Sequence, residues 1–397
     1  MNKEWLSHII AGGAFAVFIV LGLACMSVQS SRGGYAVYFD ANGGSGAVPR
    51  ELRAGSDSGI TLPGGGGLSF GNATFGGWIL YEGNTATVLE AGSTFAPTDN
   101  IVLYAKWELD AVDFNSATGL ANKLVWLQNN AESNSSYTIE VNSNERIGAQ
   151  DLNYRSKNNI TVTLAGIGAN RTVSLSSDRG NLFRVFPGVT LVLDNITLQG
   201  HGNNTTALVV CDGGTIRINA GTTVTGNTGT AYAGNGIEGV YVLNKGTVIM
   251  DGGTISGNSG EGVGVLDGTF TMNNGTISGN GSTGVVVRRD GTSNGTFTMN
   301  GGIISGHTIT GSGGGVNVFS GEFIMIGGEI SGNQVRGNDP RNFSYGYGGG
   351  VFVNSLGRFT MRGGTISGNA ASFDGNGVYL LPPAILNITG GTVQPSK

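Results

Sequence analysis

Hydrophobic and polar residues alternate in short segments that return along residues 246–369. In GTFTMNNGTISGN, residues 268–280, Phe270 and Met272 stand two apart, and Ile277 stands between Thr276 and Ser278. Because side chains two apart share one face of an extended strand, each segment predicts two half-buried strands joined by a glycine turn. No stretch of helical period lies between these strands. The pattern therefore predicts an all-β structure.

This thirteen-residue pattern occurs five times, starting at Gly246, Gly268, Gly295, Gly321 and Gly357. The starts are separated by roughly 20 to 40 residues, a spacing typical of stacked supersecondary units. A third short strand of the form Gly-Val-x-Val precedes the later copies, at residues 262–265, 284–287, 315–318 and 350–353. Three strands per repeat predict a parallel β-helix of about ten coils. The repeats resemble the right-handed, pectate-lyase-like family of that fold.

Stacking coils about 4.8 Å apart would align equivalent positions into rows of like residues. The predicted inner rows are Val248, Phe270, Phe297, Phe323 and Phe359; Met250, Met272, Met299, Met325 and Met361; and Ile255, Ile277, Ile304, Ile330 and Ile366. A methionine row could bind a soft metal ion, but evenly spaced inward methionines are expected to fill the core. We therefore expect no metal and no cofactor.

The last position of the pattern predicts a ladder at one corner of the coils. Asparagine tolerates the turn conformation, and its amide can hydrogen-bond along a stack. His307 is expected to be a substituted member of this ladder rather than a catalyst. The predicted ladder is Asn258, Asn280, His307, Asn333 and Asn369.

Composition narrows the possible partners. Glycine supplies 73 of the 397 residues, and charged residues make up only 12%. Ser, Thr, Asn and Gly must therefore cover most of the surface. The net charge of -5 offers no basic stripe, which argues against nucleic acid as a partner.

The N-terminus predicts export. Residues 1–25 have a short positive start, an apolar stretch and small residues before Cys25, as an export signal does. The ending Leu23-Ala24-Cys25 resembles a bacterial lipobox, which implies a lipid on Cys25 and a membrane anchor. The alternative is an uncleaved anchor helix. Residues 26–34 are predicted to be a flexible tether, and Cys211, the second cysteine, a core residue.

Residues 35–108 break the repeat and form a predicted separate domain. They contain Tyr38-Phe39-Asp40-Ala41-Asn42-Gly43-Gly44, Phe75-Gly76-Gly77-Trp78 and Leu103-Tyr104-Ala105-Lys106-Trp107. These motifs resemble the InlB B-repeat (Listeria-Bacteroides repeat) family. The resemblance implies a small β-grasp-like module of bacterial surface proteins. Trp78 and Trp107 are expected in its core rather than in a sugar site.

Residues 109–397 are predicted to form the β-helix. Leu120, Leu124 and Leu127 share one helical face, so residues from about 117 to 130 predict an N-terminal capping helix. At the other end, residues 385–393 predict a last coil with no clear cap, and an uncovered end would invite strand pairing.

Catalytic residues are not evident. Enzymes of this fold carry acids, bases or calcium ligands on outward strand positions. The expected outward residues of the Gly-Val-x-Val strands include Tyr241, Val286 and Phe352, and none is a general acid or base near neutral pH. Glu322 and Arg358 hold the same repeat position in consecutive coils, which predicts a cross-strand ion pair.

Binding residues are predicted where the repeat is interrupted after the ladder, at residues 228–238, 308–314, 334–349 and 370–376. Loops on a rigid scaffold commonly carry recognition, and aromatic and arginine side chains suit sugar stacking or protein contact. The alternative is that these aromatics only shield the coils. The candidate ligand-binding residues are Arg336, Asp339, Arg341, Phe343, Tyr345, Tyr347, Tyr232 and Phe373.

These observations predict a non-enzymatic, lipid-anchored protein of the bacterial cell surface that binds a glycan or a protein ligand. The alternatives are a polysaccharide lyase or glycoside hydrolase with a divergent site, and a purely structural envelope protein.

Overall fold

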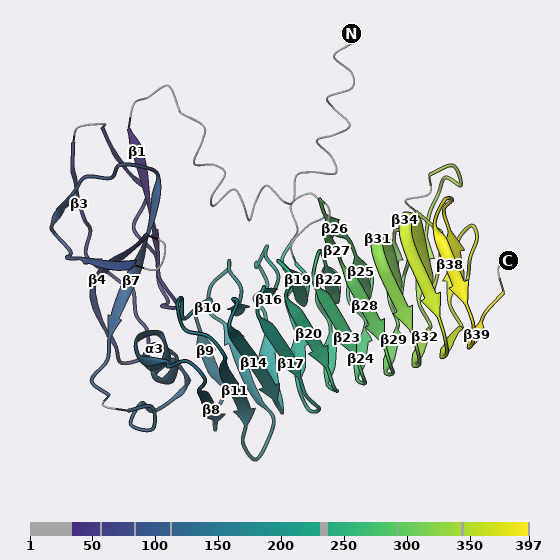
Figure 1. Cartoon of the computed structure of the whole chain (residues 1–397), viewed down its shortest axis with the longest axis horizontal. Helices are drawn as coiled ribbons and strands as arrows, with labels where there is room; N and C mark the ends of the chain where they lie inside the picture. Colours follow the sequence, from purple (N-terminus) through teal and green to yellow (C-terminus); the bar gives the residue numbers. More distant parts are fainter. Residues whose placement is uncertain are drawn as a thin grey trace, which may run out of the picture. The chain divides into compact units, whose positions relative to one another are not determined.

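The chain divides into two compact units, residues 1–110 and residues 111–397. The structure is a computed structural model, shown in Figure 1, that describes residues 34–55, 58–82, 85–111, 113–230, 237–291, 293–342 and 345–395. Among these residues, no helix has both the length and the apolar character needed to cross a membrane. The two units are described separately below.

The first unit is a small β domain. Its five-stranded sheet has the order β2-β1-β7-β4-β5, in which β1 and β7 are parallel and the other pairs antiparallel. A separate antiparallel pair joins β3 to β6. The strands are β1 (Tyr35–Asp40), β2 (Leu52–Ala54), β3 (Ile60–Thr61), β4 (Thr74–Glu82), β5 (Thr85–Leu89), β6 (Thr94–Phe95) and β7 (Ile101–Glu108).

Both tryptophans of the first unit lie in its core, as the sequence predicts. Trp78 and Trp107 are 0% and 2% exposed. Their indole N–H groups donate to the carbonyl oxygens of Pro63 and Ala41, at 2.7 and 2.9 Å. Gly44 completes this core, because a Cβ there would lie 2.4 Å from the Trp107 ring. The tryptophans therefore stabilise the domain and are not available to stack on a sugar.

The second unit is a parallel β-helix preceded by α3 (Leu120–Asn130). The first sheet is built from the strand of each coil that is equivalent in position to the Phe-x-Met strand of the repeat. It contains β8 (Ser136–Val141), β11 (Ile160–Gly166), β14 (Val189–Asp194), β17 (Thr215–Ile218), β20 (Thr247–Met250), β23 (Thr269–Met272), β28 (Thr296–Met299), the second half of β31 (Val316–Met325), the second half of β34 (Val351–Met361) and β38 (Ile385–Ile388).

The second sheet has ten parallel strands, one for each coil. It contains β9 (Glu145–Ile147), β12 (Arg171–Leu175), β15 (Ile196–Gln199), β18 (Thr223–Thr225), β21 (Thr254–Ser256), β24 (Thr276–Ser278), β29 (Ile303–Ser305), β32 (Glu329–Ser331), β35 (Thr365–Ser367) and β39 (Thr392–Val393).

The third sheet is built from the Gly-Val-x-Val strands and continues directly into the first sheet in β31 and β34. It contains β10 (Gln150–Leu152), β13 (Phe183–Val185), β16 (Val209–Asp212), β19 (Val240–Leu243), β22 (Val263–Val265), β25 (Val285–Val287), the first halves of β31 and β34, and β37 (Val378–Leu380). The hairpin formed by β26 (Arg289–Asp290) and β27 (Ser293–Asn294) interrupts one coil.

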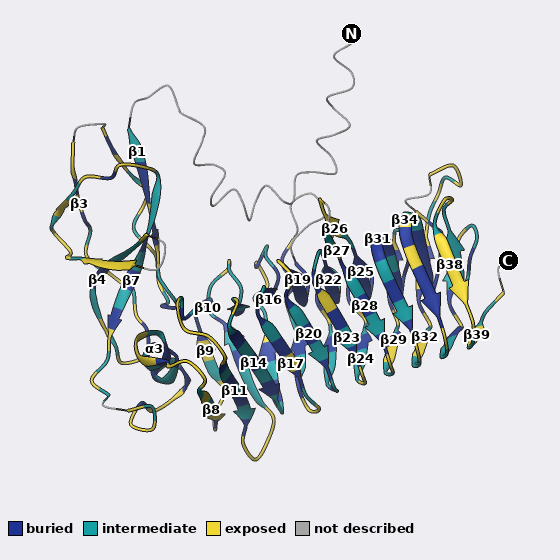
Figure 2. Cartoon of the chain, viewed as in Figure 1, coloured by how far each residue is buried: buried dark blue, intermediate teal, exposed yellow. Residues whose placement is uncertain are grey.

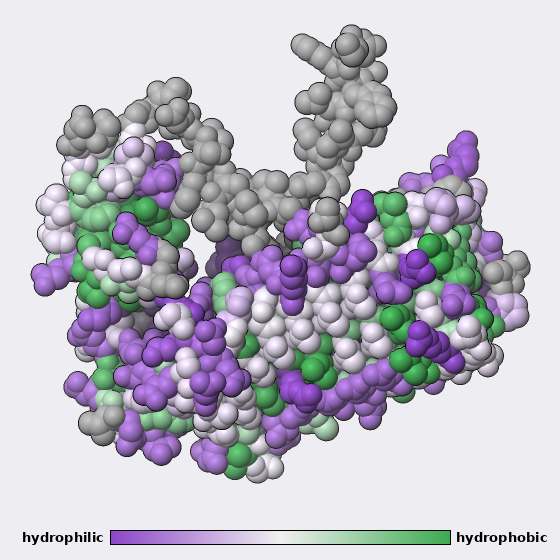
Figure 3. All heavy atoms as spheres, in the orientation of Figure 1, coloured by the Kyte–Doolittle hydropathy of each residue, from purple (hydrophilic) through white to green (hydrophobic). Residues whose placement is uncertain are grey.

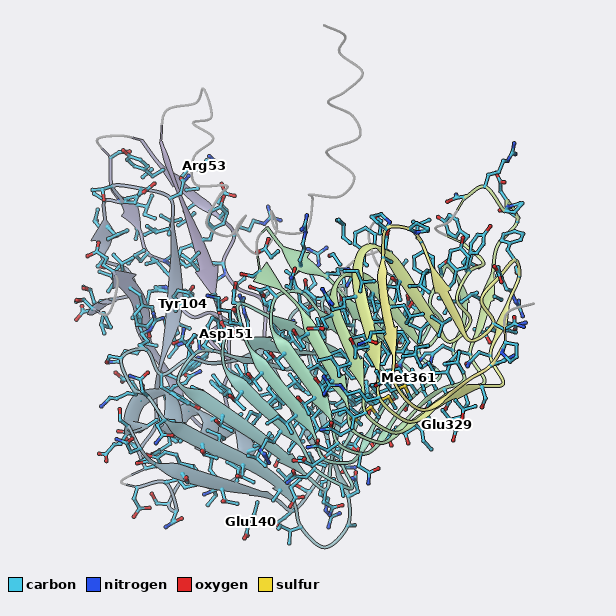
Figure 4. The ribbon with its side chains drawn as sticks, turned by 45° about the vertical axis from the view of Figure 1, so that its right-hand side comes forward. Arg53, Tyr104, Glu140, Asp151, Glu329 and Met361 are labelled. Atoms are coloured by element: carbon cyan, nitrogen blue, oxygen red, sulfur yellow. The ribbon has the colours of Figure 1, made fainter. Side chains whose placement is uncertain are left out.

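The inner rows are stacked as the repeat predicts. All residues of the phenylalanine, methionine and isoleucine rows are 0% exposed. Neighbouring rings from Phe270 to Phe359 lie nearly parallel, with centroids 4.8 to 5.0 Å apart. Figure 2 colours the strands of the coils mostly as buried or intermediate, and Figure 4 shows Met361 pointing inward while Glu140 and Glu329 point away. Burying these rows supplies the main driving force for stacking the coils.

The repeated glycine before the isoleucine strand makes room for the methionine row. At Gly275 a Cβ would lie 2.6 Å from the methyl carbon of Met250, in the preceding coil. Gly302 has the same relation to Met272, at 2.5 Å. Both glycines have positive φ, 102° and 85°, which favours glycine on conformational grounds as well. The glycine and methionine positions of the repeat therefore depend on each other across coils.

Candidate functional site

The corner between the second and third sheets is held by the predicted ladder residues. Asn258 Nδ2 donates to Asn280 Oδ1 at 3.1 Å, and Asn333 Nδ2 donates to Asn369 Oδ1 at 2.9 Å. The backbone N–H of each also donates to the next side-chain oxygen, at 3.2 and 3.0 Å. Because both asparagines are at most 2% exposed, these bonds satisfy polar groups that water does not reach.

His307 takes an asparagine position without breaking the ladder. Its Nδ1 lies 2.9 Å from Asn333 Oδ1, and its Nε2 lies 3.3 Å from Asn280 Nδ2. Asn333 Oδ1 can only accept and Asn280 Nδ2 can only donate, so the neutral imidazole with its proton on Nδ1 fits both neighbours. Burial lowers the pKa of His307, although the hydrogen bond to Asn333 acts in the opposite direction. His307 is therefore a neutral structural residue at physiological pH.

The ladder is longer than the sequence analysis predicted. Asn204 Nδ2 donates to Asn227 Oδ1 at 2.9 Å, and the Asn227 N–H donates to Asn258 Oδ1 at 3.2 Å. At the other end, the Asn369 N–H donates to Gln394 Oε1 at 2.9 Å. The Thr-Gly-Asn sequence ending at Asn227 is a weak copy of the Ser-Gly-Asn ending and could have indicated this residue.

A fourth, short sheet follows the ladder, at a position where the sequence predicted only loops. It consists of β30 (Thr308–Thr310), β33 (Gln334–Arg336) and β36 (Ala370–Ala371), all parallel. Ile309, Val335 and Ala371 pack together on its inner side and are 6%, 1% and 2% exposed. The last insertions therefore begin as ordered strands, and Arg336 belongs to β33.

Residues 334–349, here called the corner loop, hold most of the predicted binding residues. The structure divides them into an exposed group and a packed group. Arg336, Arg341 and Tyr345 are exposed, with the side chain of Arg341 90% exposed and Tyr345 40% exposed, and Asp339 is half-exposed with 45% of its side chain accessible. The Arg341 N–H and Nε donate to Asp339 Oδ1 at 3.0 and 3.1 Å, which holds the pKa of Asp339 below its usual value.

Tyr347 belongs to the packed group and anchors the loop. It is 6% exposed, its ring centroid lies 4.6 Å from that of Tyr379 and 5.4 Å from that of Phe373, and its hydroxyl donates to the Pro340 carbonyl oxygen. Phe373 packs on the loop backbone, because a Cβ at Gly346 would lie 2.7 Å from its ring. For Tyr347 and Phe373, the shielding role that the sequence left open is the one observed.

Three outward residues of the third sheet are buried. Tyr241, Val286 and Phe352 share the outward register of this sheet, yet they are 5%, 4% and 3% exposed. Gly264 leaves space for Tyr241, since a Cβ at Gly264 would lie 2.8 Å from the Tyr241 ring. The predicted outward position of these three side chains is therefore correct, but they are buried because neighbouring outer side chains and corner segments pack over them.

Two charged residues on this outer face, Arg288 and Glu261, form an ion pair. Arg288 Nη1 donates to Glu261 Oε2 at 2.9 Å, and Arg288 Nη2 bonds Glu261 Oε1, which makes a bidentate pair beside Tyr241. Burial and the charge of Glu238 raise the pKa of Tyr241, so its hydroxyl stays protonated at neutral pH. A protonated phenol and a carboxylate held by arginine are poorly suited to act as a general base.

A second pair lies three coils earlier, between β13 and β16. Arg184 Nε donates to Asp212 Oδ2 at 2.8 Å, and Asn244 Nδ2 donates to Asp212 Oδ1 at 2.6 Å. On the first sheet, Arg358 Nε lies 3.9 Å from Glu322 Oε1, the ion pair that the repeat predicts. Within the described ranges, His, Cys, Asp and Glu nowhere gather in a group of three that could hold a metal ion.

Three predicted site residues, Cys25, Tyr232 and Phe343, lie outside the described residues. Cys211 is buried, and burial raises the pKa of its thiol to about 12. Because the thiolate is the nucleophilic form, this pKa makes Cys211 unreactive at neutral pH. It serves as a core residue, as the sequence predicts.

Comparison with known families identifies the first unit. Residues 35–106 match the family model of the Listeria-Bacteroides repeat domain. This repeat indicates a protein of the bacterial surface or cell envelope. No curated protein and no solved structure matches the chain. The β-helix is therefore interpreted from its own residues.

Proposed function

We propose that this protein is a non-enzymatic binding protein of the bacterial surface, anchored through a lipid on Cys25, and that its corner loop contacts a glycan or protein ligand. The supporting observation is the division of the corner loop. Tyr347 fixes its base, while Tyr345 and Arg341 extend into solvent. An aromatic ring and a guanidinium group on a fixed base can bind a sugar or a protein without a large cost in ordering.

The repeat domain supports the location of this function, because its family occurs in surface and exported proteins. The ion pairs of the third sheet support a role without chemical turnover. Arg288 occupies both oxygens of Glu261, and Arg184 together with Asn244 occupies both oxygens of Asp212. A ligand that binds at the corner loop does not need to contact Glu261 or Asp212, so both carboxylates can stay paired.

The test is a glycan and surface-protein array with the full chain and with the double variant Tyr345→Ala/Arg341→Ala. We expect binding that falls at least tenfold in the variant, because roughly 1.4 kcal/mol of lost contact gives that change. Tyr38→Ala is the matched control, since Tyr38 is a tyrosine of the first unit with 41% exposure, close to the 40% of Tyr345. It should bind like the parent protein.

Eluted glycans are then checked for cleavage. Shortened or unsaturated products would contradict a non-enzymatic role in favour of a lyase or hydrolase. Equal binding by the parent and the double variant would show that the ligand binds outside the corner loop. No binding on either array would favour a structural envelope protein.

A further inference from the structure

Arg336 places a single charge on the outward face of the fourth sheet. It is the only charged residue of β30, β33 and β36, and Thr310 of β30 is its partner in the strand register. Both residues are exposed, while Val335 packs inside at 1% exposure. Because β33 is paired on both sides, the sheet fixes the backbone that carries Arg336. The start of the corner loop therefore presents one guanidinium group from an ordered strand.

Arg336 and Tyr345 stand close together, because the outgoing and returning arms of the corner loop cross beside them. Gly337 follows Arg336, and Gly346 follows Tyr345. A Cβ at Gly346 would lie 3.1 Å from Gly337 Cα, and a Cβ at Gly337 would lie 2.7 Å from the Tyr345 carbonyl oxygen. The two arms therefore touch where side chains are absent. The exposed guanidinium group and the exposed phenol ring start from adjacent backbone and can contact one ligand.

The crossing of the two arms is held by the coils on both sides. Phe373, in the following coil, lies over both glycines, since a Cβ at Gly337 or Gly346 would come within 2.8 and 2.7 Å of its ring. The Phe373 N–H donates to the Gly346 carbonyl oxygen at 3.0 Å, and the Gly346 N–H donates to the Gly311 carbonyl oxygen of the preceding coil at 2.6 Å. The two arms are therefore placed before a ligand binds, which lowers the ordering cost of binding.

Arg336 forms no ion pair among the described residues. Five other arginines of the second unit each pair with a carboxylate within the described ranges, and they are Arg184, Arg217, Arg288, Arg341 and Arg358. Arg336 Nη2 instead donates to the neutral Gln334 Oε1, at 3.3 Å. The acid of the next insertion, Asp374, accepts the Gly375 N–H at 2.6 Å. The rest of the Arg336 guanidinium group is therefore open to a carboxylate, which arginine binds through two parallel hydrogen bonds.

We propose that the ligand of the corner loop is an acidic peptide segment of a protein, with a carboxylate on Arg336 and an apolar side chain on Tyr345. This inference rests on the proposed function and names the class of its ligand. Tyrosine and arginine are among the side chains that most often dominate protein–protein affinity, and here they are adjacent. A charge-assisted pair adds specificity for a carboxylate over neutral groups. The corner loop, which projects above β34 in Figure 1, is hydrophilic at its tip in Figure 3, so this surface is stable in solvent until a partner binds.

The test selects binders of the full chain, held in detergent because of the apolar segment of residues 9–24, from random peptides displayed on phage. We expect the selected peptides to be enriched in Asp and Glu beside an apolar residue. Arg336→Gln should bind them at least tenfold more weakly, because it removes a hydrogen-bonded charge pair. Arg362→Gln is the matched control, since Arg362 is exposed and forms no ion pair among the described residues but lies in the turn between β34 and β35. It should bind them like the parent protein.

Reversing the charge separates recognition from a structural role. Peptides selected on Arg336→Glu should be enriched in Lys and Arg instead of Asp and Glu, because the preferred charge follows the side chain at this position. A residue that only held β33 in place would lower binding without exchanging this preference. Binding to the parent protein should also weaken as the salt concentration rises, since exposed charges are screened.

The double variant Tyr345→Ala/Arg341→Ala separates failure of this inference from failure of the proposed function. Peptides that bind the double variant tenfold more weakly but bind Arg336→Gln like the parent would overturn the acidic ligand and leave the corner loop as the site. Selected peptides without acidic enrichment, no selected peptide at all, or an unchanged preference on Arg336→Glu would also overturn it. Peptides that bind the double variant as tightly as the parent would overturn both proposals.

Discussion

In the interior of the β-helix the same residues recur from coil to coil, whereas at the corner after the asparagine ladder the residues differ from coil to coil. In the interior, the same residue returns in each coil and touches its own copy, as the stacked rings of Phe297 and Phe323 do at 4.8 Å. At the corner, successive coils carry segments of different length and composition, from residues 308–314 to the corner loop. Only a short parallel sheet, with Val335 at its centre, continues through them.

This difference follows from the neighbours that each position has. An inner side chain is enclosed by the coils before and after it, so a change in size affects several coils at once. A corner side chain such as Tyr345 has solvent on one side and tolerates change. The interior therefore maintains the stack, while the corner is free to acquire a binding role.

The largest expected effect on stability comes from a substitution in the interior of the β-helix. Phe297→Ala should lower the free energy of unfolding by about 3–5 kcal/mol, because it opens a cavity between two stacked rings. Phe319→Ala is the control on the outside, where Phe319 is 53% exposed, and it should change stability by about 0.5 kcal/mol. Urea denaturation followed by circular dichroism measures both, and equal effects would contradict the contrast between interior and exterior.

A smaller difference in stability is expected between alanine substitutions at two glycines of one repeat. Gly275→Ala should cost about 2–3 kcal/mol, because its φ is 102° and its Cβ would meet the Met250 methyl group. Gly279→Ala should cost about 1 kcal/mol, since its φ is 57° and no atom lies within 4 Å of the added carbon. Thermal denaturation of the two variants compares them. If Gly279→Ala lowered the stability more than Gly275→Ala does, the contact with the Met250 methyl group would not determine the cost of an added Cβ.

The smallest expected effect concerns pH. The folded pKa of His307 lies below its unfolded value, so the unfolded chain takes up a proton first as pH falls. Its contribution to stability is complete above about pH 6.5 and declines below it, by at most about 1.4 kcal/mol per pH unit.

The variant His307→Asn restores the asparagine of the repeat and removes this titration. Between pH 7 and pH 5, its free energy of unfolding should therefore fall less than that of the parent protein. Asn280→Gln is a ladder variant that keeps His307 and serves as the control. If the parent and His307→Asn lost stability in parallel, acid sensitivity would have to arise from other groups.

Much of the β-helix could be predicted from the repeat itself. Alternation of Phe270, Thr271 and Met272 specifies a strand and its inward face, and repetition specifies which residues become neighbours in the stack. The ladder from Asn258 to Asn369 followed in the same way. Asn204 and Gln394 were missed because the coils that carry them no longer match the repeat.

The outer surface was less predictable. Tyr241 was correctly placed in the outward register, but its burial depends on Gly264 beside it and on charged groups from other coils. The pairing of Glu261 with Arg288 joins residues on separate coils that occupy different positions of the repeat. The alternation of polar and apolar residues predicts on which face of a strand a side chain lies, but it does not predict which other side chains pack over that face.

The sequence by itself determined the strands, the inner rows, the ladder and the small repeat domain, because each depends on local alternation or on a residue meeting its own equivalent in the next coil. Only the tertiary structure decided which outward residues are buried, and that Tyr347 anchors the corner loop while Tyr345 stays exposed. These features depend on contacts between unlike segments brought together by folding.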